Sequence, residues 1–342
     1  MNWKFWEREQ LGEKKGLIGG LLGAIVISYL VVCIVLGWWW SSEPDLFDVD
    51  EHATQHARQN NRSTVTGYAT TAALDQLAAT LLEKSGGYLS NDIFPPGIWL
   101  DNIPNWEFGV LVQIRDMARA MRVDFSRSQS QSAEDPDLSE AEGRFFFDSS
   151  SWIFPQSEDQ YRDGRKYLKG YLARLSDPAL SNAQFFARAD NLRNWLTGVE
   201  TRLGGLSQRL SQSVGKRQLN IDLAGDSAAS QATNSPQDQE LKTSWFLLDD
   251  VFYEARGQSW ALVHLLKAIE QDFADVLEKK NARTSLRQII RELEATQEAV
   301  WSPMILNGSG MGFLANHSLV MASYVSRANA GLIDLRSLLE QG

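Results

Sequence analysis

The sequence predicts an all-α protein in which one apolar helix near the N-terminus is followed by a large helical bundle. Residues 17–40 contain no charged side chain. A helix of this length reaches roughly 36 Å, which exceeds the hydrocarbon core of about 30 Å in a typical membrane. Beyond residue 40, apolar residues recur at spacings of three and four, and no strand-rich region occurs. The chain therefore combines a single transmembrane helix with one long, mostly polar part.

The charges on either side of residues 17–40 predict the direction in which this helix crosses the membrane. Residues 1–15 contain four Lys and Arg side chains, whereas residues 41–57 contain none and are rich in acids. Because basic residues resist translocation, we expect residues 1–16 to form a cytoplasmic tail. The apolar segment ends in three tryptophans, residues 38–40, and not in a small-residue cleavage site. We therefore interpret it as an uncleaved signal anchor.

In a Gram-negative host, this topology places the chain in the bacterial inner membrane, with its C-terminal domain in the periplasm. In any other host, the same domain is extracellular. Some 300 residues outside the membrane are enough to bury a substantial core in one or two domains.

Composition limits the partners of the outer part. The formal net charge is −10, and residues 1–40 hold four basic and three acidic side chains, so the outer part carries −11. Such a domain repels a phosphate backbone, which argues against nucleic acid as a partner. Cys33 is the only cysteine and lies in the anchor, and the whole chain has four histidines. We therefore expect no disulfide, no cofactor and no histidine-rich metal site.

Helical periodicity divides the outer part into helices and loops. The first helical region, residues 45–84, is expected to break near Asn60 and Asn61 and to end at Gly86 and Gly87. A loop with three prolines follows it over residues 87–106. Further helices are expected at residues 107–125, 157–176, 185–210, 248–276, 284–300 and 313–339, with irregular connections at 126–137 and 145–155.

Two of these helices carry heptad-like apolar seams that require partner helices. The first seam runs from Phe185 to Leu210 and the second from Leu248 to Val276. Between them, residues 215–240 are rich in Ser, Ala, Gln, Asn and Asp and contain no aromatic residue, which is typical of a mobile linker. We therefore divide the outer part into two helical halves, residues 41–214 and 241–342.

Three short motifs each allow two interpretations. Leu219, Ile221 and Leu223 alternate with polar residues inside the linker, which leaves a short strand or a partner-docking segment open. Residues 307–312 are rich in glycine and precede a helix, and such turns can cradle phosphate through main-chain N–H groups. We interpret them as an interhelical turn, because a preceding strand and a Walker lysine are missing. Gly16 and Gly20 have the spacing that lets two membrane helices pair, although glycine is also simply common in such helices.

Two groups of carboxylates are candidates for acid–base catalysis. Glu107 follows a loop that contains Phe94 and Trp99 beside several acids, and a glycan-cleaving site requires aromatic rings next to a carboxylic acid. The alternative is an ordinary ordered loop over a helical core. Asp250 and Glu254 share a helix face, where paired carboxylates can act as acid and base or hold a cation. Acids in a first helical turn also complement the helix dipole.

A candidate metal site lies just outside the predicted anchor. His52 and His56 are four residues apart on one helix face, and Asp48 lies one turn earlier. Imidazoles at this spacing can bind zinc. Because the glutamate of an H-E-x-x-H motif is missing, we favour a solvated polar stalk instead.

A basic stripe lies on the helix expected at residues 107–125. It consists of Arg115, Arg119 and Arg122. Such a stripe can bind a carboxylate-bearing partner or a headgroup. We favour pairing of these arginines with nearby acids, namely Asp116, Asp124, Glu134 or Asp135.

Four segments of the outer part together resemble a known family. They are GGYLSND from Gly86, NWEFGVL from Asn105, DFSRSQSQS from Asp124 and ANHSLVMASY from Ala315. With these segments the chain resembles an uncharacterised family of proteobacterial inner-membrane proteins, a domain of unknown function. The resemblance implies a Gram-negative envelope location. It implies no activity, so it assigns no catalytic role to any residue.

These observations favour a non-enzymatic, membrane-tethered module that binds or organises other inner-membrane or periplasmic proteins, with homo-oligomers formed through the transmembrane helix as one option. The alternative is a cell-wall glycan hydrolase or glycan-binding protein that uses residues 90–107. A cleft in which Glu107 faces a second carboxylate at about 5–9.5 Å would favour this alternative.

Overall fold

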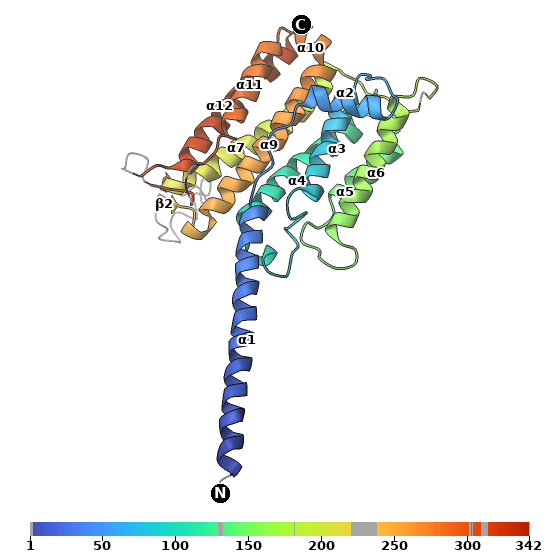
Figure 1. Ribbon diagram of the computed structural model, residues 1–342. Helices are drawn as coiled ribbons and strands as arrows, with labels where there is room; N and C mark the ends of the chain where they lie inside the picture. Colours follow the sequence, from blue (N-terminus) through green and yellow to red (C-terminus); the bar gives the residue numbers. More distant parts are fainter. Residues whose placement is uncertain are drawn as a thin grey trace, which may run out of the picture.

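The computed structural model describes residues 3–128, 133–180, 182–219, 238–300, 302, 304–308 and 314–341. Figure 1 shows a long helix, α1 (Trp3–Trp40), that projects from a bundle of helices. Within α1, Gly19–Trp40 is long and apolar enough to cross a membrane, and the bundle covers little of it. The predicted all-α fold with one N-terminal apolar helix is confirmed over these residues.

The bundle is built from helices, short helical turns and one pair of strands. The helices are α2 (Val49–Gln59), α3 (Tyr68–Glu83), α4 (Asn102–Ala120), α5 (Pro136–Phe145), α6 (Ser157–Leu175), α7 (Ala189–Ser211), α9 (Leu248–Asp272), α10 (Ala274–Lys279), α11 (Arg283–Ala295) and α12 (His317–Glu340). The turns are η1 (Gly97–Trp99), η2 (Met121–Phe125, a π-helical extension of α4), η3 (Gln212–Val214) and η4 (Trp245–Leu247). Strands β1 (Lys216–Leu219) and β2 (Asp238–Leu241) pair antiparallel.

Helix α9 lies at the centre of the bundle. It runs between α3 and α4 on one side and α7, α11 and α12 on the other (Figure 1). The hydrophobic core is continuous across it, from Trp106 of α4 through Trp260 of α9 to Leu203 of α7 and Leu332 of α12. Helices from both sides of the predicted linker therefore contribute to one core.

Two glycines let α4 and α9 approach closely. A Cβ atom at Gly109 would collide with the main-chain oxygen of Glu254, and a Cβ atom at Gly257 would collide with that of Trp106. Because these neighbours are backbone atoms, they cannot move aside unless a whole helix shifts. The observed crossing therefore requires glycine at both positions.

The apolar seams predicted for the two long helices lie inside the chain. Leu262 and Leu266 of α9 are fully buried, as is Leu203 of α7. Helix α9 packs along α4, and α7 packs along α12. The seams therefore pair with helices of the same chain. The second seam is not one continuous helix, because Phe273 separates α9 from α10.

Residues 43–47 follow α1 in the chain and form a non-helical strap that packs along α9. Every second residue of the strap contacts α9 one turn further along: Glu43 with Arg256 (2.7 Å), Asp45 with Trp260 (3.3 Å) and Phe47 with His264 (3.0 Å). These contacts are an ion pair, an indole N–H donating to a carbonyl, and a main-chain N–H donating to Nε2. The spacings match, because two extended residues advance about 6.6 Å and four helical residues advance about 6 Å.

Helix α2 packs into the bundle, which corrects our expectation of a solvated stalk. Val49, Ala53 and Ala57 are buried, and α2 contacts α3 and α9. The predicted break after α2 is present, since α2 ends at Gln59 and α3 begins at Tyr68. The polar face of α2 that suggested a stalk is only one side of an amphipathic helix.

Several helix boundaries differ from the sequence prediction. Helix α2 begins at Val49 and not at Asp45, α7 begins at Ala189 and not at Phe185, and α11 ends at Ala295 and not at Val300.

Two further differences have a local cause. Helix α4 begins at Asn102 and not at Glu107, because Asp101 caps it and Pro104 lies in its first turn, where no main-chain N–H is needed. The predicted irregular connection at residues 126–137 contains the start of α5, a helix that we did not predict. Asp135 caps α5 by accepting hydrogen bonds from the next main-chain N–H groups, and Pro136 is its first residue.

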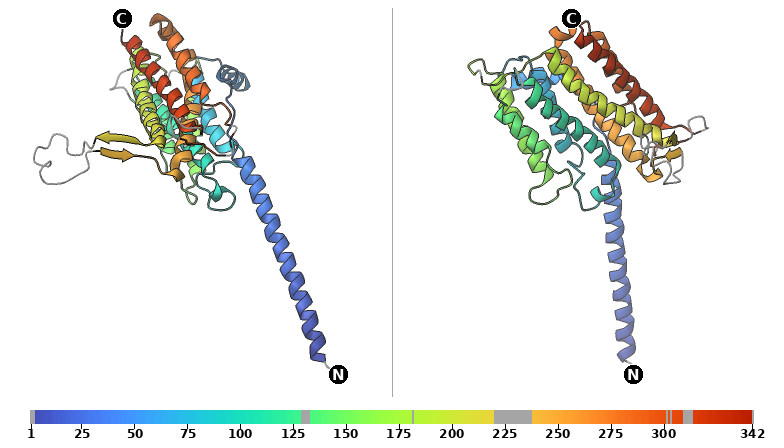
Figure 2. Two further views of the ribbon diagram at one scale, coloured as in Figure 1. Left: turned by 90° about the vertical axis from the view of Figure 1, so that its left-hand side faces the viewer. Right: turned by 180° about the vertical axis from the view of Figure 1, so that it is seen from behind.

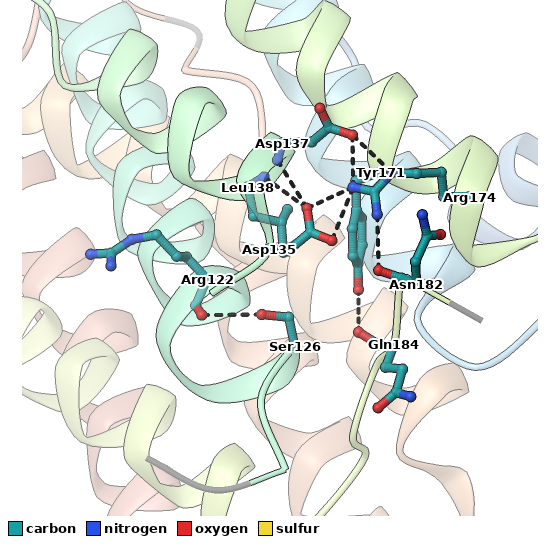
Figure 3. Close-up of polar contacts among 9 residues, drawn as sticks. All are labelled: Arg122, Ser126, Asp135, Asp137, Leu138, Tyr171, Arg174, Asn182 and Gln184. Carbon is teal, nitrogen blue, oxygen red and sulfur yellow. Dashed lines mark hydrogen bonds and ion pairs between the residues drawn. The ribbon is translucent and has the colours of Figure 1, made fainter. Parts of the chain in front are cut away.

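Arg174 of α6 connects α5 and α6. Its guanidinium pairs with Asp135 and Asp137, each at 2.7 Å, and donates to the carbonyl of Asn182 at 3.0 Å (Figure 3). A guanidinium can satisfy two carboxylates because its five N–H donors lie in one plane. Arg174 therefore fixes both the cap of α5 and the segment that leads towards α7.

Part of the predicted linker and part of the glycine-rich segment lie outside the described residues. Strands β1 and β2 pair at the two ends of the linker, with Lys216 opposite Leu241. Residues 220–237, which include Ile221 and Leu223, are not among those described. The same is true of residues 309–313, across which Asn307 and Asn316 form an isolated bridge.

Candidate functional site

A groove of about 680 Å³ lies between α4 and α7, with α9 at its floor. Helix α4 and η2 contribute Phe108, Val112, Asp116, Arg119, Ala120, Val123 and Asp124; α7 contributes Asn194, Trp195, Gly198, Val199, Thr201, Arg202, Gly205, Leu206 and Arg209; α9 contributes Glu254 and Gln258. The groove is open because α4 packs along α9, whereas α7 packs along α12. It follows α4 for about 24 Å, taking 1.5 Å per residue.

The α7 wall of the groove has an unfilled strip of small residues. Gly198 and Gly205 are exposed, and a Cβ atom at either position would meet no other atom within 4 Å. Thr201 lies between them on the same face. Helices usually pack by placing ridges of side chains into grooves. The strip lacks such a ridge, so it leaves room for the ridge of another helix.

The α4 wall presents apolar side chains to the groove. Phe108 and Val123 are more than a third exposed, and Val112 lies between them nearer the floor. Exposed apolar side chains along a groove between helices are typical of a surface that binds the apolar face of a partner helix.

Charged side chains cross or border the groove. Arg202 of α7 pairs with Asp116 of α4 at 2.8 Å, and Arg209 pairs with Glu254 at 2.5 Å. Burial raises the pKa of Asp124, which accepts a hydrogen bond from Asn194 at 3.1 Å. Because Arg202 is half exposed, its pair contributes at most about 1 kcal/mol and can exchange for contacts with a partner.

One buried donor in the groove has no partner among the described residues. Trp195 is 4% exposed and lines the groove, yet its indole N–H makes no hydrogen bond there. Leaving a buried donor unpaired costs about 1–3 kcal/mol.

The structure encloses Glu107, our first catalytic candidate, in a polar cluster inside the fold. Its side chain is 0% exposed, and its carboxylate pairs with Nζ of Lys84 at 2.6 Å. It also accepts hydrogen bonds from the main-chain N–H groups of Leu89 (2.9 Å) and Ser90 (2.8 Å). Burial raises the pKa of Glu107, whereas the Lys84 ammonium and the Ser90 hydroxyl oppose that shift. The carboxylate has no exposed surface from which it could protonate a glycan.

Asp250 and Glu254 share a helix face, as expected, but they have different surroundings. Asp250 accepts a hydrogen bond from Nδ2 of Asn105 at 2.7 Å, and burial raises the pKa of its carboxyl. Glu254 is held by Arg209 and by Nε2 of Gln258 at 2.9 Å. Glu254 borders the groove and Asp250 does not.

The structure brings His52 and His56 together without a third metal ligand. Their ring centroids lie 6.1 Å apart, and Nδ1 of His56 is 2.9 Å from the Tyr68 hydroxyl. Asp48 instead caps α2 by accepting the N–H of Glu51. Burial lowers the pKa of both histidines. Among the residues that the structure describes, no group of three potential metal-ligating side chains occurs.

The arginine stripe is largely engaged within the chain. Arg115 donates to the carbonyls of Phe145 and Phe147, while Arg119 and Arg122 pair with Glu142. Arg122 also pairs with Glu134 at 2.6 Å, one of the acids that the sequence suggested. Glu142 was missed because it lies on α5, which we did not predict.

Gly16 and Gly20 lie in the projecting part of α1. A Cβ atom at Gly20 would meet nothing within 4 Å, so this face of the helix has room for lipid or for a second helix.

The groove itself was not found from the sequence, because its walls lie about 80 residues apart in the chain. One signal was present. Gly198, Thr201 and Gly205 form a second, small-residue face on a helix whose opposite face already carries an apolar seam.

These features define a class: an all-α bundle that follows an apolar N-terminal helix and carries a groove between two of its helices. The chain belongs to the family of uncharacterized proteins conserved in bacteria (DUF2333), whose family model matches residues 13–342. No curated protein and no solved structure matches the chain. The resemblance to a family without an assigned activity is thereby confirmed.

Proposed function

We propose that this protein is a non-enzymatic module, tethered to the bacterial inner membrane, that binds other envelope proteins by accepting a helical segment in the groove between α4 and α7. The observation that carries this proposal is the groove itself. It has two helical walls, exposed apolar side chains on one of them and glycines on the other. Recognition of an amphipathic helix uses such a groove.

The dimensions and chemistry of the groove suit one helix of about 16 residues. Its length of about 24 Å along α4 corresponds to that many residues in a helix. Its lining carries both signs of charge, with Arg119 and Arg202 opposed by Asp116 and Asp124. The proposed segment therefore has an apolar face flanked by both acidic and basic residues.

The proposal includes the topology predicted from the charges: an N-terminal tail in the cytoplasm, α1 in the inner membrane and the bundle in the periplasm. The asymmetry of Lys and Arg around Gly19–Trp40 supports it. Protease added to intact spheroplasts should digest the bundle while a cytoplasmic marker stays protected. Protection of the bundle in sealed spheroplasts would contradict this topology.

Filling the groove tests the binding function. A Cβ atom at Gly198 or Gly205 would meet no other atom within 4 Å, so Gly198→Trp and Gly205→Trp should extend an indole ring into the groove without disturbing the fold. Gly143→Trp is the matched control, because Gly143 is equally unhindered but lies on α5, outside the groove. Full-length protein should be purified from membranes with its bound proteins. The two groove variants should lose the same bound protein that the control retains.

An enzymatic function would give a different result. Glu254→Gln should leave the cellular role intact if the groove only binds, since a catalytic carboxylate typically contributes 10²–10⁴-fold in rate through proton transfer. Release of glycan fragments from cell wall by the full-length protein, abolished by Glu254→Gln, would favour a glycan hydrolase whose site is the groove and not residues 90–107.

Pairing of two copies through the Gly16 and Gly20 face remains part of the proposal. Gly20→Leu fills the open face of α1 and should weaken cross-linking between copies in membranes, whereas Ile34→Leu should not. Unchanged cross-linking in the Gly20 variant would remove this pairing from the proposal.

A further inference from the structure

A loop of the bundle extends alongside the end of α1. A Cβ atom at Gly37 would lie 3.6 Å from the side chains of Pro96 and Leu100. Cys33, one turn earlier on the same face, is also buried. Gly37 and Cys33 lie about 4.5 Å and about 10.5 Å before the end of the helix. The loop of residues 93–100 therefore reaches the level of the last turns of the apolar span Gly19–Trp40.

This loop exposes large apolar side chains at that level. Phe94 is 73% exposed, and Ile98 and Trp99 are each more than half exposed. Trp38 and Trp39 of α1, at the same level, are exposed as well. Tryptophan and other aromatic residues concentrate at membrane–water interfaces, where one part of the ring is apolar and another is wet.

A second loop lies beside the first and has the same character. The Tyr88 hydroxyl donates to the carbonyl of Ser149, and Nδ2 of Asn91 donates to that of Ser151, each at 2.8 Å. The tip of this second loop, residues 152–154, exposes a Trp, an Ile and a Phe, and Phe154 is 94% exposed. Figures 1 and 2 show that both the α3–α4 connection and the α5–α6 loop reach past the point where α1 joins the bundle.

The position of these loops relative to α1 is fixed by the strap of residues 43–47. Its three contacts with α9 leave no unattached stretch between the apolar helix and the bundle. A ring of Trp40 also packs against Gly86, at the start of the same connection. Once α1 spans a membrane, the two loop tips are therefore held at its surface.

We propose that residues 93–99 and 152–154 insert into the interfacial layer of the membrane that α1 spans, so that the bundle rests on the bilayer through these two loops. The partner is the lipid surface and not another protein. The inference rests on α1 being a membrane anchor, which belongs to the proposed function. Asp92, Asp101, Asp148 and Glu158 flank the loops. Insertion is therefore driven by apolar side chains and not by anionic headgroups.

The single cysteine makes a direct test feasible. Cys33→Ala gives a background without thiols, into which Ile98→Cys or Phe154→Cys is introduced and coupled to a nitroxide. The full-length protein is placed in phosphatidylcholine liposomes. The collision rate of each label with oxygen, which partitions into lipid, is compared with that of a water-soluble nickel chelate. Glu278→Cys on α10, exposed at the far end of the bundle, is the aqueous control.

Labels at positions 98 and 154 should collide more with oxygen than with the nickel chelate, and the label at 278 should show the reverse. A label at either loop position that prefers the nickel chelate, as at 278, would overturn the proposal. Ile27→Cys, in the middle of the apolar span, separates this failure from failure of the anchor. Lipid exposure at 27 with aqueous exposure at 98 or 154 overturns the insertion of the two loops alone. Aqueous exposure at 27 overturns both the membrane anchor and the insertion of the two loops.

Discussion

Glu107 and Glu254 lie on the two helices that cross at the centre of the bundle, yet their surroundings are opposite. Glu107 is sealed with Lys84, which is itself 2% exposed in its side chain, and its carboxylate is surrounded by donors from Leu89 and Ser90. Glu254 borders the groove, and its partner Arg209 is 43% exposed. From the sequence, both carboxylates were candidates for catalysis. The difference shows that a completed internal cluster supports the fold, whereas a partner that faces solvent leaves a carboxylate able to meet a ligand.

The largest effect is expected from breaking the buried ion pair between Glu107 and Lys84. Glu107→Gln leaves the Lys84 ammonium buried without a counter-charge, and breaking a buried pair in this way costs about 3–5 kcal/mol. Chemical denaturation of the full-length protein in detergent should measure this loss. Lys84→Met should destabilise the protein as well, and the double variant should lose less than the sum of the two. A loss below about 1 kcal/mol for Glu107→Gln would show that the cluster is not sealed.

His264 is another buried ionisable group, and its burial predicts that the stability of the protein depends on pH. Burial lowers the pKa of His264 to about 3, with Lys267 and His52 adding to the shift and the Trp260 carbonyl opposing it. Between about pH 6.5 and pH 3 the unfolded chain binds a proton at this histidine that the folded chain does not. Its contribution to stability is therefore lost as the pH falls, by about 2 kcal/mol at pH 5.

The variant His264→Gln isolates this contribution, because all other titrating groups are common to both proteins. The difference in free energy of unfolding between the wild type and the variant should shrink by about 2 kcal/mol from pH 7.5 to pH 5. A difference that stays constant over this range would mean that His264 is accessible to protons in the folded protein.

A smaller effect is expected at the groove carboxylate. Glu254→Gln removes the charge that pairs with Arg209, but that guanidinium keeps contact with water. We therefore expect a loss of about 1 kcal/mol in the free energy of unfolding. A loss as large as that of Glu107→Gln would place Glu254 among the sealed groups and would weaken the case for the groove.

The smallest effect on stability is expected at Gly198. Its Cβ atom would meet no other atom within 4 Å, and its replacement by Trp removes a glycine from a helix interior, so the free energy of unfolding should change by less than about 0.5 kcal/mol. Gly257→Ala is the matched contrast, because its Cβ atom would collide with the backbone of α4. If Gly198→Trp destabilises the protein as much as Gly257→Ala does, the groove is filled by the chain itself.

The sequence was informative where a few neighbouring residues determine the outcome. The apolar helix, the break after α2 and the burial of Leu262 and Leu266 all follow from local periodicity, and the structure has all three. Even α5 had a local signal that was overlooked, since Asp135 followed by Pro136 is a typical helix start.

The nature of the candidate sites depends on residues that are distant in the chain. The loop before Glu107 looks like a glycan site until Lys84 and the main chain of residues 89–90 close around the carboxylate. The stalk that we expected at His52 is a packed helix, because its apolar face meets α3 and α9. The groove needs α4 and α7 to be held apart by different neighbours, which no single segment reveals.

The strap of residues 43–47 attaches the end of α1 to α9, so α1 and the bundle rotate together. A domain on a flexible tether has no fixed orientation, because only the length of the tether limits where it can move. Here the three contacts with α9 fix the direction of the groove relative to α1, and with α1 in a membrane as proposed they also fix its distance from the bilayer. With α1 in a membrane as proposed, a rotation of α1 about its own axis, for instance when two copies pair, would therefore turn the groove to face a different direction in the membrane plane.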